Sequence, residues 1–316
     1  WLVEFFFQIR NYEKNTIATT EMAIESRKYM QKIIDDTGIK FDRSNCGILH
    51  VYKSHAEFEH AHRVNELLAK GGLERRRLNE KEVLEIEPSL KTNYVGGYYT
   101  KTDSTGDIHK FTLNLARVAN DRGVKFQLNS DVKSIKAKGS EVEIMFYPFN
   151  MGQRIETFDT CVICAGVASH RFAKMLGDRV NIYPIKGYSI TLPLADKVSQ
   201  KKAPKVSILD DEAKIVTSRL GKNRFRVAGT AEISGCNLDI LDARINPLKK
   251  WVEQNCPEVS TKDAQPWAGL RPMRPNMMPL VSRGKKENIF YNTGHGHLGW
   301  TLACYTAHMV GELIKD

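Results

Sequence analysis

The stretch of residues 288–314 most constrains what this chain can fold into. A short apolar run, Asn-Ile-Phe-Tyr-Asn-Thr, leads into Gly294-His-Gly296-His-Leu-Gly299, and a helical pattern follows. The spacing is G-x-G-x-x-G, which binds a dinucleotide pyrophosphate when it lies in a βαβ unit with an acidic residue about 20 positions on. The sequence stops at Asp316, before a second strand of such a unit. We therefore expect the loop to cradle a polar group in another role, using the N–H groups and dipole of the helix it opens.

Length and charge suggest a two-domain globular protein. At about 150 residues for each domain, 316 residues predict two domains. The net charge of 47 − 37 = +10 favours an acidic partner, an anionic ligand or an anionic membrane surface, although a solvated basic surface is the simpler interpretation. The basic residues form no long run and the cysteines no zinc-finger spacing, which argues against nucleic acid as a partner.

The cysteines and the first residues bear on the cellular setting. Cys161 and Cys164 lie in an apolar run, and no second pair completes a metal site, so we expect no metal and buried, reduced thiols in a reducing compartment. Residues 1–7 are largely apolar, but they are too short for a membrane span and lack the basic region of a signal peptide. Because the chain begins with Trp1 instead of Met, we expect that an upstream part is missing.

Hydrophobic periodicity predicts an α/β (α+β) fold. Helices are expected at 21–36, 55–70, 79–87 (capped by Asn79), 108–121 (capped by Asp107), from about 169, and at 243–254. Strands are expected at 46–52, 124–128, 131–135, 141–146 and 158–164, with an antiparallel sheet from 182–192, 206–209, 214–218 and 224–228. Residues 96–107 and the proline-punctuated residues 269–279 are expected to be loops.

Arg271 is the main candidate for binding an anion. It lies between Leu270 and Pro272 in the stiff segment 269–279, and an arginine held in this way can form a two-pronged contact with a carboxylate or phosphate. A surface ion pair is the alternative, and it is the interpretation kept for Arg274.

The histidines of the glycine loop are candidates as well. His295 and His297 flank Gly296, and no third ligand accompanies them, so we expect no metal. A histidine against a ligand and a hydrogen-bonded packing histidine both remain open. Trp300 is interpreted as a core residue.

Four strings of the sequence together resemble a known family. They are Thr-Gly-Asp (105–107), Tyr-Pro-Ile-Lys-Gly-Tyr-Ser (183–189), Ala-Gly-Leu-Arg-Pro-Met-Arg-Pro (268–275) and Tyr-Asn-Thr-Gly-His-Gly-His-Leu-Gly-Trp-Thr-Leu-Ala-Cys (291–304). Over nearly its whole length the chain resembles the small subunits of bacterial D-amino acid dehydrogenases, N-terminally truncated. These are FAD-dependent amine oxidoreductases of the D-amino acid oxidase superfamily.

The resemblance implies a reaction and its residues. A D-amino acid, typically D-alanine, loses its α-hydrogen as hydride to FAD, and hydrolysis then gives a 2-oxo acid and ammonia while electrons pass to a quinone or respiratory acceptor. Arg271 would hold the substrate carboxylate, with Lys186 and Tyr188 as weaker candidates near the substrate. The implied FAD contacts are Val132, Ala165 and Gly166 on the adenine and ribose side, and Gly294, His295, Gly296, His297, Leu298, Gly299, Trp300 and Thr301 at the flavin ring.

The resemblance also implies a domain plan. A Rossmann-like FAD-binding domain, with its N-terminal βαβ unit missing from the sequence, would comprise 96–175 and 268–316. A substrate domain with a mixed, largely antiparallel sheet would comprise 1–95 and 176–267. Without the pyrophosphate loop we expect the chain alone to bind FAD poorly and to be inactive. We expect a cytoplasmic location, with peripheral association at the inner face of the bacterial inner membrane as a further option.

Two alternatives remain open. One is another amine dehydrogenase or oxidase of the same superfamily, acting on glycine, sarcosine or hydroxyproline. The other is a non-catalytic subunit or fragment that has the substrate domain and binds no FAD.

Overall fold

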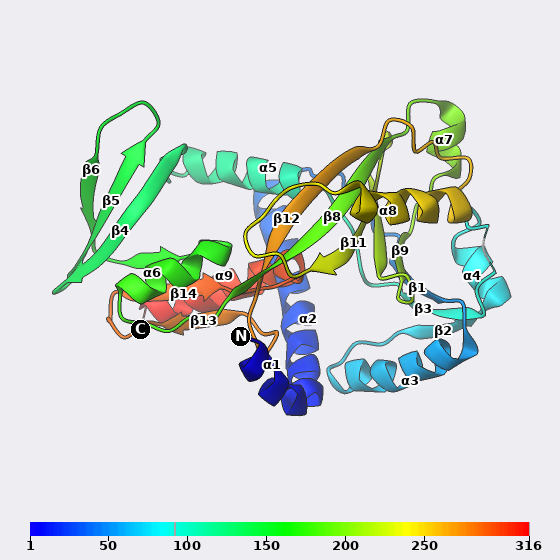
Figure 1. The fold of residues 1–316 in the computed structure, drawn as a ribbon, viewed down its shortest axis with the longest axis horizontal. Coiled ribbons are helices and arrows are strands. Elements are labelled where there is room, and N and C mark those ends of the chain that lie inside the picture. Colours follow the sequence, from blue (N-terminus) through cyan, green and yellow to red (C-terminus); the bar gives the residue numbers. More distant parts are fainter. Residues whose placement is uncertain (92, 316) are drawn as a thin grey trace. The chain divides into compact units, whose positions relative to one another are not determined.

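The computed structural model describes residues 1–91 and 93–315. The chain forms two compact units, whose positions relative to each other are not determined (Figure 1). Unit 1 comprises Trp1–Gly38, Ala116–Pro184 and Arg271–Asp316, and unit 2 comprises Ile39–Leu115 and Ile185–Leu270.

The helices and strands alternate along most of the chain. The helices are α1 (Leu2–Gln8), α2 (Tyr12–Thr37), α3 (His55–Lys70), α4 (Glu80–Ile86), α5 (Ile108–Asp121), α6 (Ser169–Met175), α7 (Lys197–Lys202), α8 (Asp242–Asn255) and α9 (Gly299–Lys315), with short 3-10 turns at Ile9–Asn11 and Gly166–Ala168. The strands are β1 (Ile48–Tyr52), β2 (Arg76–Asn79), β3 (Gly96–Thr100), β4 (Ser130–Lys138), β5 (Glu141–Pro148), β6 (Arg154–Phe158), β7 (Cys161–Ile163), β8 (Tyr183–Pro193), β9 (Ser207–Asp210), β10 (Ile215–Leu220), β11 (Arg224–Glu232), β12 (Gln265–Met273), β13 (Leu280–Arg283) and β14 (Ile289–Thr293).

Unit 1 contains a small sheet in the order β13-β14-β7, in which β7 runs parallel to β14. The run Ile-Phe-Tyr in β14 is buried throughout, which is the pattern of a strand covered on both faces. A three-stranded antiparallel meander, β4-β5-β6, the paired helices α2 and α9, and the short helices α1 and α6 belong to the same unit (Figure 1). Its core joins the two sheets and α6 through buried side chains of Ile135, Val142, Ile163, Phe172, Ile289 and Tyr291.

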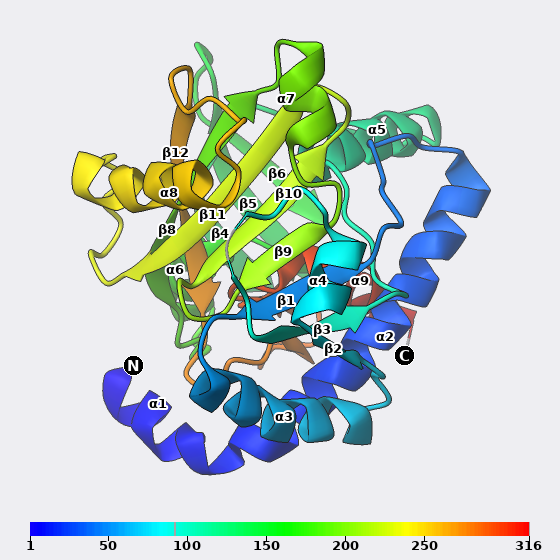
Figure 2. The ribbon, with the colours of Figure 1, turned by 90° about the vertical axis from the view of Figure 1, so that its right-hand side faces the viewer.

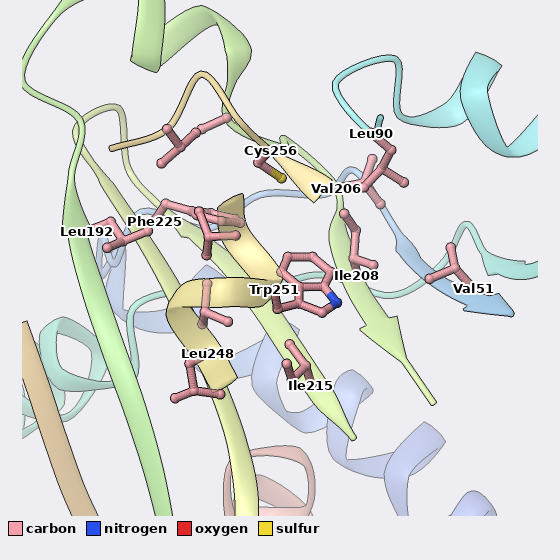
Figure 3. Close-up of a cluster of buried hydrophobic side chains, with 14 of the residues drawn as sticks. Val51, Leu90, Leu192, Val206, Ile208, Ile215, Phe225, Leu248, Trp251 and Cys256 are labelled. Carbon is pink, nitrogen blue, oxygen red and sulfur yellow. The ribbon is translucent and has the colours of Figure 1, made fainter. Parts of the chain in front are cut away.

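Unit 2 is built on a sheet in the order β12-β8-β11-β10-β9-β1-β3-β2, to which unit 1 contributes only the ends of β8 and β12 (Figure 2). Neighbours from β8 to β9 are antiparallel, and β9 is parallel to β1. Helix α8 packs its apolar stripe on this sheet, and Trp251 lies at the centre of the resulting core (Figure 3). The indole N–H of Trp251 donates to Asp210 Oδ2 at 2.8 Å, which satisfies both buried polar groups.

The sequence predictions of fold class and of most elements are confirmed. The α/β class with its antiparallel sheet is present, and the helices at 55–70 and 108–121 have the expected bounds. Asp107 accepts a hydrogen bond from the backbone N–H of Lys110, and Asn79 forms a capping box with Glu82. Among the described helices, none is long and apolar enough to cross a bilayer.

The prediction of a loop at 96–107 is wrong for its first part, which is strand β3. Gly96 and Gly97 lie within the strand because neighbouring atoms leave no room for a side chain. A Cβ on Gly96 would lie 2.5 Å from the Phe58 ring, and one on Gly97 would lie 2.5 Å from the carbonyl oxygen of His50. These glycines permit a close approach of backbone to its neighbours, not a turn.

The strand predicted at 124–128 is also wrong. These residues are described and adopt no regular structure, and Val124, Phe126 and Leu128 are exposed. An apolar run becomes a strand only where a partner strand accepts its hydrogen bonds. The expectation of buried thiols is wrong for Cys164, which is exposed, although all six cysteines are free.

The segment 269–279, expected to be a loop, begins as strand. Arg271 and Pro272 lie on β12, an edge strand of the sheet, where a proline need not donate a ladder hydrogen bond. The unit boundaries also differ from the domain plan at the start of the chain. Trp1–Gly38 packs with the C-terminal segment because α2 lies along α9 and the Trp1 indole N–H donates to the Met273 carbonyl at 2.7 Å.

Candidate functional site

The glycine loop is fastened to the end of β12. The Gly296 N–H donates to the Pro272 carbonyl at 3.0 Å, and His295 forms an antiparallel bridge with Met273. Gly294 has φ +73°, and a Cβ there would lie 2.5 Å from Arg274 Cδ. The protein's own packing therefore requires glycine at the first position of the loop.

The side chain of Arg274 packs against Gly294 of the glycine loop. Its Nη1 donates to the carbonyls of Met278 and Pro279 at 3.2 and 3.1 Å, and burial lowers the pKa of its guanidinium. The predicted surface ion pair is therefore wrong for Arg274, because the side chain binds backbone carbonyls in a half-buried position.

Two N–H groups of the glycine loop are used within the protein, which leaves the start of α9 as the expected source of donors. Gly296 N–H is taken by Pro272 and Leu298 N–H by His295, so neither faces a ligand. The first helical bond runs from Leu302 N–H to the Leu298 carbonyl at 2.9 Å, and the N–H groups at 299–301 precede it. Donors for an anion are therefore expected at the first turn of α9, where the helix dipole also favours negative charge.

Two glycine turns meet at the carboxyl ends of parallel strands. Strand β7 ends at Ile163 and is followed, after Cys164, by Ala165-Gly166, and β14 ends in Thr293 before the glycine loop. Ser169 Oγ lies 2.7 Å from Thr293 Oγ1, and Thr293 Oγ1 also donates to the Gly166 carbonyl at 3.4 Å. The carboxyl edge of a parallel pair is where α/β sheets bind ligands. The structure thus brings together Ala165, Gly166 and the loop that starts at Gly294.

Val132 lies on β4 in the same unit. Its carbonyl accepts a hydrogen bond from Arg171 Nη2 at 3.0 Å, and its side chain packs against the core of unit 1. Since Arg171 belongs to α6, the helix that follows the Gly166 turn, Val132 is tied to that turn through one short helix.

Arg271, His295 and His297 have different surroundings. Burial lowers the pKa of Arg271, whose side chain is half-buried on β12. His295 Nε2 lies 2.9 Å from Thr306 Oγ1, whose hydroxyl donates to the Ala303 carbonyl, so His295 is the donor to Thr306. Burial first, and then the charge of Arg271, lower the pKa of His297. His295 is thus a packing histidine, while His297 lies near enough to Arg271 for that charge to lower its pKa.

Lys186 and Tyr188 belong to unit 2, where both side chains are 1% exposed. Lys186 Nζ lies 3.0 Å from Glu232 Oε1, and the Tyr188 hydroxyl donates to Glu232 at 3.3 Å. The hydrogen bond from Lys186, followed by that from Arg244, lowers the pKa of Glu232 to about 2. These contacts give Lys186 and Tyr188 a role in joining β8 to the end of β11.

A buried polar network in unit 2 was missed by the sequence analysis, which named no candidate site residue before Val132. His50 Nδ1 lies 3.0 Å from Asp211 Oδ2, and the Tyr52 hydroxyl donates to the same oxygen. Arg75 Nη2 donates to His50 Nε2, which fixes the imidazole as the neutral Nδ1–H tautomer. Burial lowers the pKa of His50. The alternation of His50 and Tyr52 on one strand face was the available signal, but Arg75 and Asp211 come from distant segments.

Replacing Gly294 by alanine is expected to destabilise unit 1 by about 1–3 kcal/mol, because the residue must keep a positive φ and its Cβ would meet Arg274. Urea unfolding followed by circular dichroism measures this. Gly311→Ala is the matched control, since a Cβ at that position would have no atom within 4 Å, and in a helix alanine is expected to stabilise by about 1 kcal/mol. Equal stability of the two variants would contradict the packing described for the loop.

Comparisons with known proteins agree with one another. A family model described as FAD dependent oxidoreductase (DAO) matches residues 6–313. D-amino acid dehydrogenase 3 of Mesorhizobium japonicum is 48% identical over 314 residues, covering 99% of this chain and 76% of the relative. The D-amino acid dehydrogenase of Paramagnetospirillum magneticum is 40% identical over 312 residues, covering 96% of this chain and 71% of the relative.

Solved structures share the fold at low sequence identity. Glycine oxidase from Bacillus cereus superposes with a TM-score of 0.81 at 21% identity, over 93% of this chain and 80% of that chain. L-proline dehydrogenase from P. horikoshii gives a TM-score of 0.80 at 18% identity, over 93% and 78%. The family match over nearly the whole sequence and the 48% identical relative show that the chain belongs to the DAO family of FAD-dependent oxidoreductases.

Proposed function

We propose that this chain carries out the FAD-dependent oxidative deamination of a D-amino acid, with D-alanine as the first substrate to test. The products are a 2-oxo acid and ammonia, and the electrons pass to a quinone or another respiratory acceptor. The observation that carries the proposal is the 48% identity, over 99% of the chain, to a protein named D-amino acid dehydrogenase.

The residues at the carboxyl edge of β7 and β14 fit a bound flavin dinucleotide. Gly166 has φ +54° and open space where a Cβ would lie, so backbone can approach a ligand there. We assign Val132, Ala165 and Gly166 to the adenine and ribose side. We assign the segment Gly294, His295, Gly296, His297, Leu298, Gly299, Trp300 and Thr301 to the ring side, with the first turn of α9 providing the N–H donors. When bound, FAD supplies the acceptor for the hydride of the substrate.

Arg271 is proposed to hold the substrate carboxylate. A guanidinium in a half-buried position loses hydration that an anion can replace, and the edge strand β12 fixes its backbone. Orienting the substrate by its carboxylate fixes the direction of the Cα–H bond, which is the contribution that positioning makes to the rate. Lys186 and Tyr188 stay predictions as substrate-side residues, since their contacts with Glu232 support a role in packing.

We propose that the two units have different roles, one mainly in binding FAD and the other mainly in binding the substrate. Unit 1 contains the assigned FAD contacts and Arg271, and unit 2 contains most of the segments of the substrate domain that the resemblance implies. A cytoplasmic location, with peripheral attachment to anionic lipid at the inner face of the inner membrane, agrees with the net charge of +10.

A second function has support from the fold. Another amine dehydrogenase or oxidase of the family, acting on glycine, sarcosine or hydroxyproline, agrees with the superposition on glycine oxidase. A non-catalytic subunit without FAD remains the third alternative, and a protein that takes up no flavin would support it.

The FAD-loaded protein is expected to be bleached by D-alanine without oxygen and reoxidised by a dye or quinone. The measurement is the flavin absorbance in anaerobic mixing, followed by steady-state turnover with each acceptor. L-alanine is the control and is expected to leave the flavin oxidised. Rapid peroxide formation with oxygen alone would move the assignment to an oxidase, and bleaching by glycine but not by D-alanine would favour the alternative substrate.

A further inference from the structure

We propose that His297 recognises the α-amino group of the substrate, accepting a hydrogen bond from that group while Arg271 holds the carboxylate. This inference rests on the proposed function, since it names the residue that distinguishes an amino acid from a plain carboxylic acid at the same site.

The end of β12 brings His297 close to Arg271. Met273 bridges His295 in an antiparallel sense, and Gly296 N–H donates to the Pro272 carbonyl at 3.0 Å. This hydrogen bond joins the residue that follows Arg271 to the residue that precedes His297. Gly296, with φ +57°, and His297 then form a turn, so His297 lies at a turn next to the end of β12.

The electrostatics agree with this placement. Within the described chain, Arg271 is the charged group that acts on His297. Burial and that positive charge both lower the pKa of His297, so at neutral pH its imidazole is uncharged and one ring nitrogen is an acceptor. The neighbouring His295 does not compete for this role, because its Nε2–H is engaged by Thr306 on α9.

The chemistry of an α-amino acid matches such a pair of groups. Its amino nitrogen and its carboxylate are bonded to one carbon, so a ligand held at Arg271 carries its N–H donors within a few ångströms of the guanidinium. Protein atoms surround part of the His297 ring, which lowers its pKa, and the rest of the side chain is exposed, so a ligand can reach it. A neutral imidazole accepts from an amine or ammonium, whereas a protonated imidazole repels it and has no acceptor.

A matched pair of ligands tests this directly. 2-Aminoisobutyrate has no α-hydrogen and so cannot be oxidised, and 2-methylpropanoate differs from it by the amino group alone. Dissociation constants of both are measured from the flavin absorbance of the holoenzyme. His297→Phe is expected to weaken 2-aminoisobutyrate about ten- to hundredfold and to leave 2-methylpropanoate within about twofold, as loss of one hydrogen bond to a charged group would do.

Two further measurements make the result specific. His297→Gln retains an acceptor and is expected to recover part of the lost affinity. Lowering the pH through the pKa of His297 is expected to weaken 2-aminoisobutyrate in the wild type and not in His297→Phe. Equal loss of both ligands, or no loss of either, would overturn the inference. Because neither ligand reacts, the result is independent of whether D-alanine is oxidised, which the flavin bleaching decides.

Discussion

Replacement of Arg271 by alanine is expected to lower kcat/KM for D-alanine by about a hundred- to a thousandfold. The guanidinium is half-buried on β12, and burial lowers its pKa. A two-pronged contact with the carboxylate would orient the substrate, and removing one partner of such a pair costs about 2–5 kcal/mol. The measurement is steady-state turnover with a dye acceptor, together with the flavin content of the purified variant.

Two variants separate recognition from general damage. Arg271→Lys keeps the charge but not the planar fork, and it is expected to recover only part of the activity. Arg179→Ala is the matched control, since Arg179 is in the same unit with its side chain 84% exposed, and it is expected to change kcat/KM by less than about twofold. An unchanged KM in Arg271→Ala with normal flavin content would remove Arg271 from the substrate role.

The elements of this fold that were predictable are those whose signal is local. The helix at 55–70 is indicated by its period and ends at Gly71, and the caps at Asn79 and Asp107 bind the backbone three residues on. The antiparallel strands from β8 to β11 were predictable because their alternating apolar and polar residues, and the turns between them, lie within one continuous stretch of sequence.

The elements that were not predictable depend on what lies opposite them. Gly96 and Gly97 have the composition of a turn, and only the Phe58 ring and the His50 carbonyl explain why a strand contains them. Residues 124–128 have the pattern of a strand and lack the pairing that would make one. The sequence of a segment indicates which secondary structures it can adopt. The segments that pack against it determine which of these structures forms.

The candidate site, too, was predictable only in part. The strand–loop–helix of residues 288–314 was correctly predicted, yet the reasons for its glycines were not. Gly294 accommodates Arg274, and the Gly296 N–H serves Pro272, so the loop is held by β12. That attachment brings His297 near Arg271, a relation invisible in the sequence because the two residues are far apart and Arg271 was expected in a loop.

The core of unit 2 gives the largest stability effect, since Trp251→Ala is expected to cost about 3–5 kcal/mol. Trp251 is 3% exposed and packs among side chains of the sheet and of α8, including Ile208, Ile215 and Leu248 (Figure 3). Truncation leaves a cavity that these neighbours cannot fill. It also removes the indole donor of Asp210 Oδ2, a carboxylate that is 1% exposed. Urea unfolding followed by circular dichroism measures the loss.

Two comparisons separate the cavity from the hydrogen bond. Trp251→Phe keeps a buried six-membered ring and removes the donor with the pyrrole part of the indole, so it is expected to cost about 1–3 kcal/mol, chiefly from the buried acceptor left unsatisfied. Trp267→Ala changes the same residue type where it is 58% exposed, and it is expected to stay within about 1 kcal/mol of the wild type. If Trp251→Phe proved as unstable as Trp251→Ala, the contact with Asp210 would outweigh packing as the reason for a tryptophan at this position, because both variants lose the donor and only one leaves a large cavity.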